Sequence, residues 1–223
     1  MPWGRTAAEY EAFFSLSGSS PRTRVLDCGG GPASFVAEWG ARGHFAVAPD
    51  PIYALPSREI AGGFEATAAR MLQGMRAARD RFRWDHYGTP EAVVEQRRAA
   101  LDAYVEDREA ATRAGRYVAA RMEALPFASG SFDLVLCSHL LFLYSDEIDL
   151  DTHVAALREM LRVGREVRVF PLVNLHGEPS AHLGGVIERL GPKAVCEVVP
   201  VPFEFQAGAS RMLRLIPFPQ PAS

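Results

Sequence analysis

The residues with the clearest capacity for chemistry lie in the segment 24–50. A short apolar run, Val25-Leu26, leads into Asp27-Cys28-Gly29-Gly30-Gly31, and Asp50 follows 21 positions after Gly29. Glycines allow a tight turn between a strand and a helix, and they leave no Cβ to obstruct a ligand resting on the backbone. The second acid, expected at the end of the next strand, stands where it can accept hydrogen bonds from a ribose diol. The spacing predicts a nucleotide-type cofactor site.

Asp27 narrows the choice of ligand. Its carboxylate precedes the first glycine, where it would repel a pyrophosphate. The pattern therefore favours a nucleoside that carries a cationic or zwitterionic tail. The alternative is that the glycines form an ordinary turn and that Asp50, between Pro49 and Pro51, is an ordinary loop acid.

This segment resembles motif I of the class I (Rossmann-like) S-adenosylmethionine-dependent methyltransferases, Asp/Glu-x-Gly-x-Gly-x-Gly. Here Ala33 replaces the third glycine. The resemblance implies that S-adenosyl-L-methionine is the cofactor. It implies that Asp27 orders the loop and approaches the methionyl ammonium, and that the backbone of Gly29, Gly30 and Gly31 lines the cofactor. Asp50 would bind the ribose hydroxyls.

A second segment, residues 123–135, resembles the link between the third and fourth strands of many small-molecule methyltransferases. It reads Glu-Ala-Leu-Pro-Phe, then a short loop, then Phe-Asp-Leu-Val. Family members commonly place an adenine-binding acid before this segment, and the alignment puts Arg121 there. The adenine is therefore expected on backbone groups of Met122 and Glu123, with the Met122 thioether against its face. The alternative for Met122 is a plain core position.

Polar residues follow the expected fourth strand. Ligands of doubly wound sheets bind at the carboxyl ends of the strands, so Ser138 and His139 are expected at the reactive end of the cofactor. His139 is the candidate catalytic base, and Tyr144 is expected to orient the acceptor. Methyl transfer from a sulfonium is an in-line displacement that positioning alone can promote, so a structural role for His139 stays open.

The acidic run at residues 146–151 is interpreted as a solvated approach to a helix, and no metal site is predicted. Ser138 occupies the position where a metal-dependent methyltransferase would be expected to carry a carboxylate. His153, on the helix that follows, is expected to pack or cap.

Strands and helices alternate as a doubly wound α/β fold requires. The prediction is one domain over residues 1–223 with a seven-stranded, mostly parallel sheet that ends in an antiparallel hairpin. Strands are expected over 24–27, 44–48, 117–120, 132–138, 167–172, 195–201 and 212–216, and core helices over 6–16, 33–42, 152–163 and 179–190. Asp151 is expected to cap the third of these helices, and Pro179 to lie in the first turn of the fourth.

Residues 57–115 exceed what one helix between the second and third strands needs. Helical periodicity covers 64–83 and 90–112, and the break between them carries Phe82, Trp84, His86 and Tyr87. We expect a helical insert over the carboxyl edge of the sheet, acting as a lid that excludes water and shapes the acceptor pocket. The alternative is that the aromatic residues only hold the two helices together, and His86 is expected on an exposed loop.

Composition limits the possible partners. The net charge is −3 and Lys193 is the only lysine, so neither nucleic acid nor an anionic membrane is expected to bind. No apolar run is long enough to span a bilayer, the early residues lack a signal-peptide pattern, and the three cysteines have no metal-like spacing. These features predict a cytoplasmic protein, and they leave its oligomeric state open.

The combined prediction is S-adenosylmethionine-dependent methyl transfer to an oxygen or nitrogen of a small molecule. Two alternatives remain. One is a non-catalytic scaffold that binds S-adenosylmethionine, with its pocket closed or serving a partner protein. The other is an NAD-dependent oxidoreductase, which Asp27 and the closing hairpin disfavour.

Overall fold

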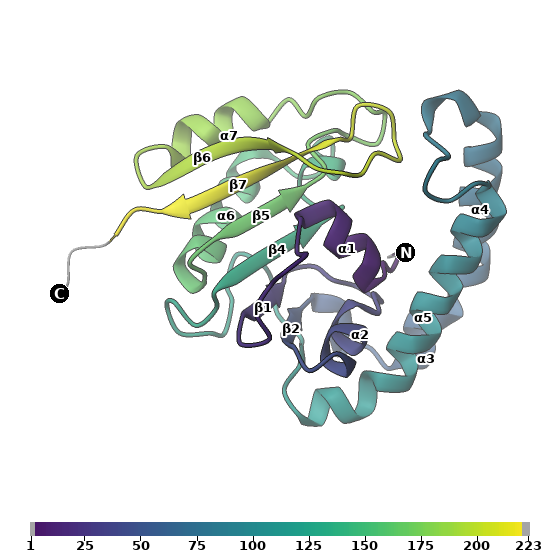
Figure 1. Cartoon of the computed structure of the whole chain (residues 1–223), viewed down its shortest axis with the longest axis horizontal. Helices are drawn as coiled ribbons and strands as arrows, with labels where there is room; N and C mark the ends of the chain where they lie inside the picture. The colour runs from purple at the N-terminus through teal and green to yellow at the C-terminus, as the bar shows by residue number, and fades with distance from the viewer. Residues whose placement is uncertain (1–2, 220–223) are drawn as a thin grey trace.

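The fold is organised by one mixed sheet. The computed structural model describes residues 3–219, and in that range the sheet has seven strands: β1 (Arg24–Asp27), β2 (Phe45–Pro49), β3 (Tyr117–Val118), β4 (Leu134–Ser138), β5 (Val167–Phe170), β6 (Ala194–Pro200) and β7 (Arg211–Pro217). They lie in the order β3-β2-β1-β4-β5-β7-β6 (Figure 1). Strands β1 to β5 pair in parallel, whereas β7 is antiparallel to both β5 and β6. The predicted doubly wound sheet with a closing hairpin is confirmed.

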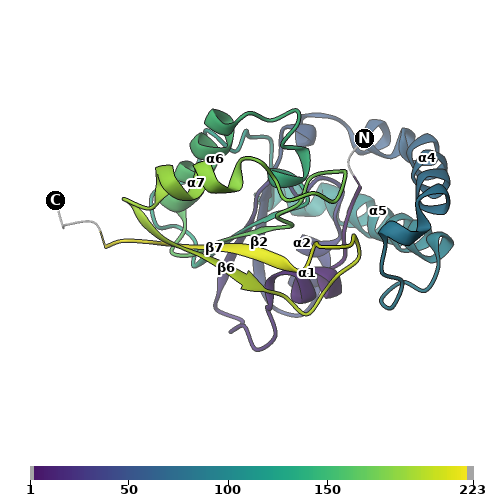
Figure 2. The ribbon, with the colours of Figure 1, turned by 90° about the horizontal axis from the view of Figure 1, so that it is seen from above.

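Helices cover both faces of the sheet. They are α1 (Ala7–Phe14), α2 (Phe35–Ala41), α3 (Ser57–Gly62), α4 (Phe64–Ala77), α5 (Pro90–Arg113), α6 (Leu150–Val163) and α7 (Leu183–Leu190). Helices α6 and α7 lie on one side of the sheet, and α1 and α2 lie on the other (Figure 2). Each side has its own apolar core, one around Phe13 and Phe170 and the other around Leu157 and Leu213.

Two helix starts differ from the prediction. Asp149, not Asp151, caps α6, because its side chain accepts a hydrogen bond from the Thr152 amide at 2.8 Å. Pro179 does not open α7, which begins at Leu183. Pro179 is instead held in extended conformation by an isolated bridge to Val173, so the helix starts one turn later.

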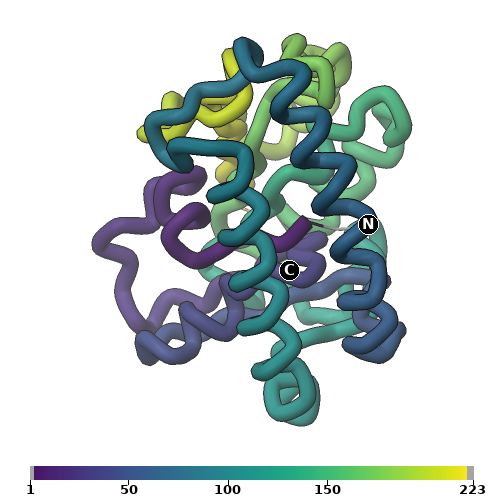
Figure 3. The backbone as a smooth tube through the Cα atoms, turned by 90° about the vertical axis from the view of Figure 1, so that its right-hand side faces the viewer, coloured from purple at the N-terminus to yellow at the C-terminus, as the bar shows by residue number. Residues whose placement is uncertain are grey.

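The insert consists of α3, α4 and α5. Figure 1 shows α4 and α5 beyond the carboxyl ends of β4 and β5, and Figure 3 shows the two helices side by side. The first helical stretch is shorter than predicted, because α4 ends at Ala77 and a short 3-10 turn, Arg79–Arg81, follows it. The helical insert at the carboxyl edge is therefore observed, with an earlier break.

The aromatic residues of the insert contact a different part of the chain from the one expected. Phe82, Trp84 and Tyr87 surround Phe205, with ring centroids 4.9, 5.4 and 4.7 Å away. Phe205 lies in the loop between β6 and β7, and its carbonyl accepts a hydrogen bond from the Arg83 amide at 2.6 Å. The cluster thus joins the insert to the closing hairpin, and Tyr87 also contacts Arg97 on α5. His86 is exposed, as predicted.

A buried ion pair ties the insert to the first helix. The Arg97 guanidinium on α5 donates two hydrogen bonds to the Glu9 carboxylate on α1, at 2.7 and 2.5 Å, and the two side chains are 1% and 0% exposed. The Tyr87 hydroxyl also donates to Glu9. Although burial alone would raise it, Arg97 and then Arg5 lower the pKa of Glu9 to about 2. Glu9 is therefore a charged anchor between the N-terminal segment and the insert.

Loss of the anionic partner is expected to be the more damaging change. Glu9→Gln should lower the free energy of unfolding by about 3–5 kcal/mol, because it leaves buried positive charge without compensation. Arg97→Met should cost less, since Glu9 keeps Arg5 as a neighbouring cation. Urea denaturation at pH 7 measures both. Arg76→Met, which removes an exposed pair with Glu91, is the control and should cost about 1 kcal/mol or less. Equal costs for the two buried substitutions would contradict the expected order.

Candidate functional site

A cavity of about 540 Å³ lies at the carboxyl ends of β1 and β4. All the site residues expected from the sequence line it except Asp27: Gly29, Gly30, Gly31, Asp50, Met122, Glu123, Ser138, His139 and Tyr144. Further walls come from Trp3, Arg5 and Tyr10 near the N-terminus, which the sequence did not indicate, and from Thr67 and Met71 on α4 of the predicted insert. The cavity therefore combines the glycine loop with the insert.

The glycine loop is packed too closely for larger residues. Gly29 has a φ of +71°, and a Cβ there would lie 2.3 Å from Leu140 Cδ2. A Cβ on Gly30 would lie 2.3 Å from the Asp27 carboxylate. The loop is also fixed from both neighbouring strands, since the Cys28 amide donates to Leu136 O at 2.8 Å and the Gly29 amide to Pro49 O at 2.9 Å. The result is a rigid backbone surface that faces the cavity without side chains.

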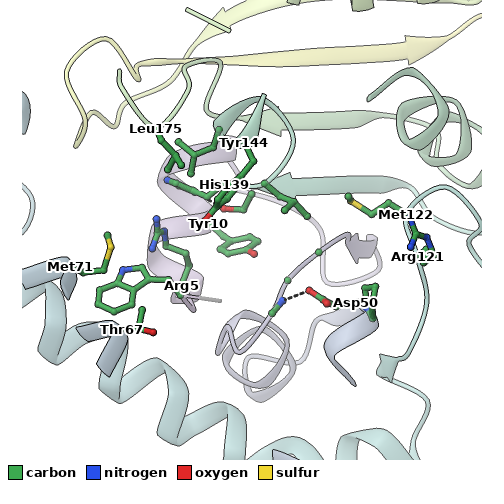
Figure 4. Close-up of a pocket in the computed structure, with 18 of the residues that line it drawn as sticks. Arg5, Tyr10, Asp50, Thr67, Met71, Arg121, Met122, His139, Tyr144 and Leu175 are labelled. Atoms are coloured by element: carbon green, nitrogen blue, oxygen red, sulfur yellow. Dashed lines mark hydrogen bonds between the residues drawn. The ribbon is translucent and has the colours of Figure 1, made fainter. Parts of the chain in front are cut away.

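Asp50 holds this loop and faces the cavity. One carboxylate oxygen accepts from the Gly31 amide at 3.0 Å (Figure 4), and the other accepts from the Ile52 amide at 2.9 Å. Burial raises the pKa of Asp50, while the two amide hydrogen bonds oppose that rise. Each oxygen retains acceptor capacity beyond its one backbone bond. Asp50 can therefore accept hydrogen bonds from hydroxyl groups in the cavity while it fixes Gly31.

Asp27 lies behind the loop. Its side chain is 1% exposed, and both of its oxygens accept from the Tyr10 hydroxyl, at 2.9 and 3.0 Å. Burial raises the pKa of Asp27 to about 7, the Tyr10 hydrogen bond lowers it, and the nearby Asp50 raises it further. No cation is among these causes, so a positive charge arriving at the loop would favour the ionised carboxylate.

The expected adenine end of the cavity is polar at its rim. Arg121 has a side chain that is 75% exposed and forms an ion pair with Glu123 at 3.1 Å. Its charge is thus compensated and directed toward solvent. Met122 lies beside the glycine loop, where its sulfur would be 3.6 Å from a Cβ at Gly29. Figure 4 shows Met122 and Arg121 at one end of the cavity, with Arg5 and Met71 at the other.

His139 is held in an unusual conformation. Its φ is +51°, its amide donates to Phe170 O at 2.6 Å, and its Nδ1 lies 2.9 Å from the Ser138 hydroxyl. The ring packs against both Phe13 and Phe170, with centroids 4.8 and 5.2 Å away. Burial, followed by the charges of Arg5 and Arg97, lowers the pKa of His139 well below its usual value. The imidazole is therefore neutral at pH 7.

Tyr144, at the end of the 3-10 turn Phe142–Tyr144, is 36% exposed.

Other reactive residue types lie outside the cavity. His153 is buried on α6, with its Nδ1 2.8 Å from Asp149 O, which agrees with the predicted packing role. Cys28 and Cys137 are buried free thiols.

Across residues 3–219, no group of three or more His, Cys, Asp or Glu side chains is arranged to hold a metal ion. Within the same range, no helix has the length and apolar character needed to cross a membrane.

Asp27→Asn tests whether the buried Asp27 carboxylate lowers the free energy of unfolding when it is ionised. An unfolded Asp has a pKa of about 3.9. Since the folded pKa is about 7, the folded state binds more protons between these values, and the free energy of unfolding falls as pH rises through this window. Relative to wild type, the variant should therefore gain about 2–3 kcal/mol between pH 5 and pH 8. Urea denaturation of the ligand-free proteins at both pH values measures this gain. An identical stability difference at both pH values would exclude the raised pKa.

Comparison with known proteins supports a methyltransferase assignment. A family model described as "Methyltransferase domain" matches residues 90–167, from the start of α5 into β5. An uncharacterized protein of Methanocaldococcus jannaschii, MJ0045, is 26% identical over 211 residues, which cover 94% of this chain and 93% of the relative.

The chain is also similar to solved structures. TrmN from Thermus thermophilus has a TM-score of 0.50 at 18% identity, over 95% of this chain and 49% of its own. Magnesium protoporphyrin IX methyltransferase from Synechocystis has a TM-score of 0.48 at 12% identity, over 95% of this chain and 78% of its own.

The matched domain and the observed strand order agree with the glycine loop and the second acid at its expected spacing. The chain thus resembles the class I, Rossmann-like S-adenosylmethionine-dependent methyltransferases in its fold and its glycine loop, and residues 90–167 match a methyltransferase domain.

Proposed function

We propose that the protein transfers a methyl group from S-adenosylmethionine to an oxygen or nitrogen of a small-molecule acceptor. One observation carries this proposal. A single cavity is lined both by the glycine loop with Asp50 and by groups suited to an acceptor, His139 and Tyr144 after β4 and Met71 on the insert. A shared cavity lets the protein hold two reactants in contact, which is the main requirement of an in-line displacement.

The residues at one end of the cavity suit the cofactor. S-adenosylmethionine supplies an electrophilic methyl group on a sulfonium that departs as a neutral thioether. Met122 and Glu123 would hold the adenine, and Asp50 the ribose hydroxyls. The exposed backbone of the glycine loop would line the methionyl part, where Asp27 behind the loop favours a cation. Ser138 would close the site at the end of β4.

The acceptor is expected to enter beside Tyr144. Met71, Tyr144 and Leu175 line the cavity and are 42%, 36% and 44% exposed. These exposed walls connect the cavity to solvent on the side of the insert and away from Asp50. A non-catalytic scaffold would be expected to have a sealed methyl position, so this access favours the enzyme.

His139 is proposed to orient the acceptor. Its neutral imidazole can accept a hydrogen bond from an acceptor hydroxyl or amine. Protonation would place a third positive charge near Arg5 and Arg97, so His139 is poorly suited to retain the proton that the acceptor loses. Its contribution is therefore placement of the nucleophile, with Tyr144 beside it, and the proton leaves to solvent.

Calorimetric titration with S-adenosylhomocysteine, S-adenosylmethionine and NAD tests the proposed function first. Micromolar binding of the two adenosyl ligands without NAD is the expected result, and labelled methyl donor then identifies acceptors. Binding of NAD alone would favour an oxidoreductase. Absence of binding by all three would leave a partner-binding scaffold.

Asp50→Ala should weaken S-adenosylhomocysteine binding by about 1.5–3 kcal/mol for each hydrogen bond lost to the ribose. Because Asp50 also holds the Gly31 amide, part of that loss arises from the loop. The 2′-deoxy analogue isolates the ribose contact. Wild type should bind S-adenosylhomocysteine about tenfold more tightly than the 2′-deoxy analogue, and this preference should disappear in Asp50→Ala.

Calorimetry of both ligands with both proteins completes this cycle. Asp146→Ala changes an acid whose side chain is 55% exposed, and it serves as the control that keeps the preference. A ribose preference that survives in Asp50→Ala would exclude the direct contact.

A further inference from the structure

A second, smaller cavity adjoins the first on the side of the insert. It has a volume of about 140 Å³ and shares six wall residues with the main cavity: Trp3, Arg5, Met71, His139, Leu143 and Leu175. Neither the glycine loop nor Asp50 lines it. We refer to it as the apolar chamber. It provides space next to His139 that the proposed cofactor residues do not reach.

The walls of the apolar chamber are largely hydrophobic. Phe82, Phe203 and Phe205 contribute aromatic rings, and Met75 and Val93 contribute aliphatic surface. A cavity of about 150 Å³ with such a lining accommodates one benzene molecule. The chamber therefore suits a single aromatic ring or an aliphatic group of similar size.

Arg5 lines the chamber together with three other polar residues, Arg97, His139 and Gln206. The Nε and Nη1 atoms of Arg5 are buried and have no hydrogen-bond partner among residues 3–219. Burial, followed by the charge of Arg97, lowers the pKa of Arg5 to about 10, so the side chain remains cationic at pH 7. Buried donors on a charged group are costly unless they are paired.

The charges around Arg5 do not balance. Within the described range, Glu9 is the acid whose charge offsets Arg5, and both of its oxygens already bind Arg97. Two guanidinium groups thus face one carboxylate. His139 adds no negative charge, and Tyr10 and Tyr87 keep their protons because burial raises both phenol pKa values. One positive charge is left at the wall between the two cavities.

We propose that Arg5 and the apolar chamber form the acceptor subsite, and that the acceptor is an aromatic or compact apolar molecule carrying a carboxylate that pairs with Arg5. This inference rests on the proposed function. The apolar body would lie in the chamber, and the carboxylate would satisfy the unpaired Nε and Nη1 groups. The nucleophilic oxygen or nitrogen would then face the main cavity beside His139.

The methionyl carboxylate of the cofactor offers the same chemistry. The Arg5 carbonyl accepts from the Ser34 amide just after the glycine loop at 3.0 Å, but the Arg5 side chain also lines the chamber, which the glycine loop does not line, and this second contact favours the acceptor. The two sources differ in one measurable respect. If Arg5 pairs with an acceptor carboxylate, it is not needed for binding S-adenosylhomocysteine. If it pairs with the methionyl carboxylate, it is needed for binding S-adenosylhomocysteine but not for binding 5′-methylthioadenosine, which lacks that carboxylate.

The test uses benzoate and its neutral analogue benzamide as probes, titrated into the protein saturated with S-adenosylhomocysteine. Wild type should bind benzoate at least tenfold more tightly than benzamide. Arg5→Met should abolish this preference while changing S-adenosylhomocysteine affinity less than threefold. Arg5→Lys, which keeps the charge, should retain part of the preference. Arg121→Met removes an arginine from the opposite end of the main cavity and should leave the preference for benzoate unchanged.

Thermal unfolding without ligand provides a second readout. Arg5→Met removes an uncompensated buried charge, so its Tm should equal or exceed that of wild type. A large drop in Tm would assign Arg5 a structural role and overturn the inference.

Two further results would also overturn it. One is wild-type protein that binds S-adenosylhomocysteine but does not prefer benzoate. The other is an Arg5→Met variant whose affinity for S-adenosylhomocysteine falls tenfold while its affinity for 5′-methylthioadenosine is unchanged. Failure of wild type to bind any adenosyl ligand would instead reject the proposed function itself.

Discussion

The buried carboxylate of Glu9 is the interaction on which the site depends. It joins α1 to α5 through Arg97 and lies close to Arg5, so it fixes the N-terminal segment and the insert relative to each other. Those two segments contribute walls of the cavity. Because breaking a buried ion pair costs several kcal/mol, this pair holds α5 against α1. The aromatic contacts of the insert with Phe205 add a second attachment, to the closing hairpin.

The hydrogen-bond partners of two buried acids, Glu9 and Asp27, decide whether each carboxyl group is ionised. Burial favours the neutral form of both Glu9 and Asp27, but only Glu9 has guanidinium partners, which hold its pKa near 2. Asp27 has a phenol as its partner, and its pKa rises to about 7. The protein therefore presents an acid that a cation would ionise on the cofactor side. At the end of the cavity beside Met71 it presents Arg5, a cation without a full complement of anions. The two ends are prepared for ligands of opposite charge.

The comparisons with known proteins bear on different parts of the chain. The family match runs from α5 into β5 and does not include the glycine loop, whose assignment rests on its own residues and packing. The structural resemblance at a TM-score of 0.50 establishes the fold alone. The N-terminal segment and the insert line the part of the cavity that we propose for the acceptor, so the acceptor preference is expected to depend on them.

The sequence by itself determined the sheet, its closing hairpin, the helical insert and the residues around the glycine loop. These features depend on local patterns such as apolar runs, glycines and the spacing from Gly29 to Asp50, which the chain carries wherever it folds. Local patterns did not fix the caps of α6 and α7, because neighbouring acids compete for a cap and an extended bridge holds Pro179. Only the tertiary structure brought Arg5, Glu9 and Arg97 together, since α1 and α5 are distant in sequence and meet through packing. The unpaired charge of Arg5 is therefore a property of the assembled fold, which no local pattern encodes.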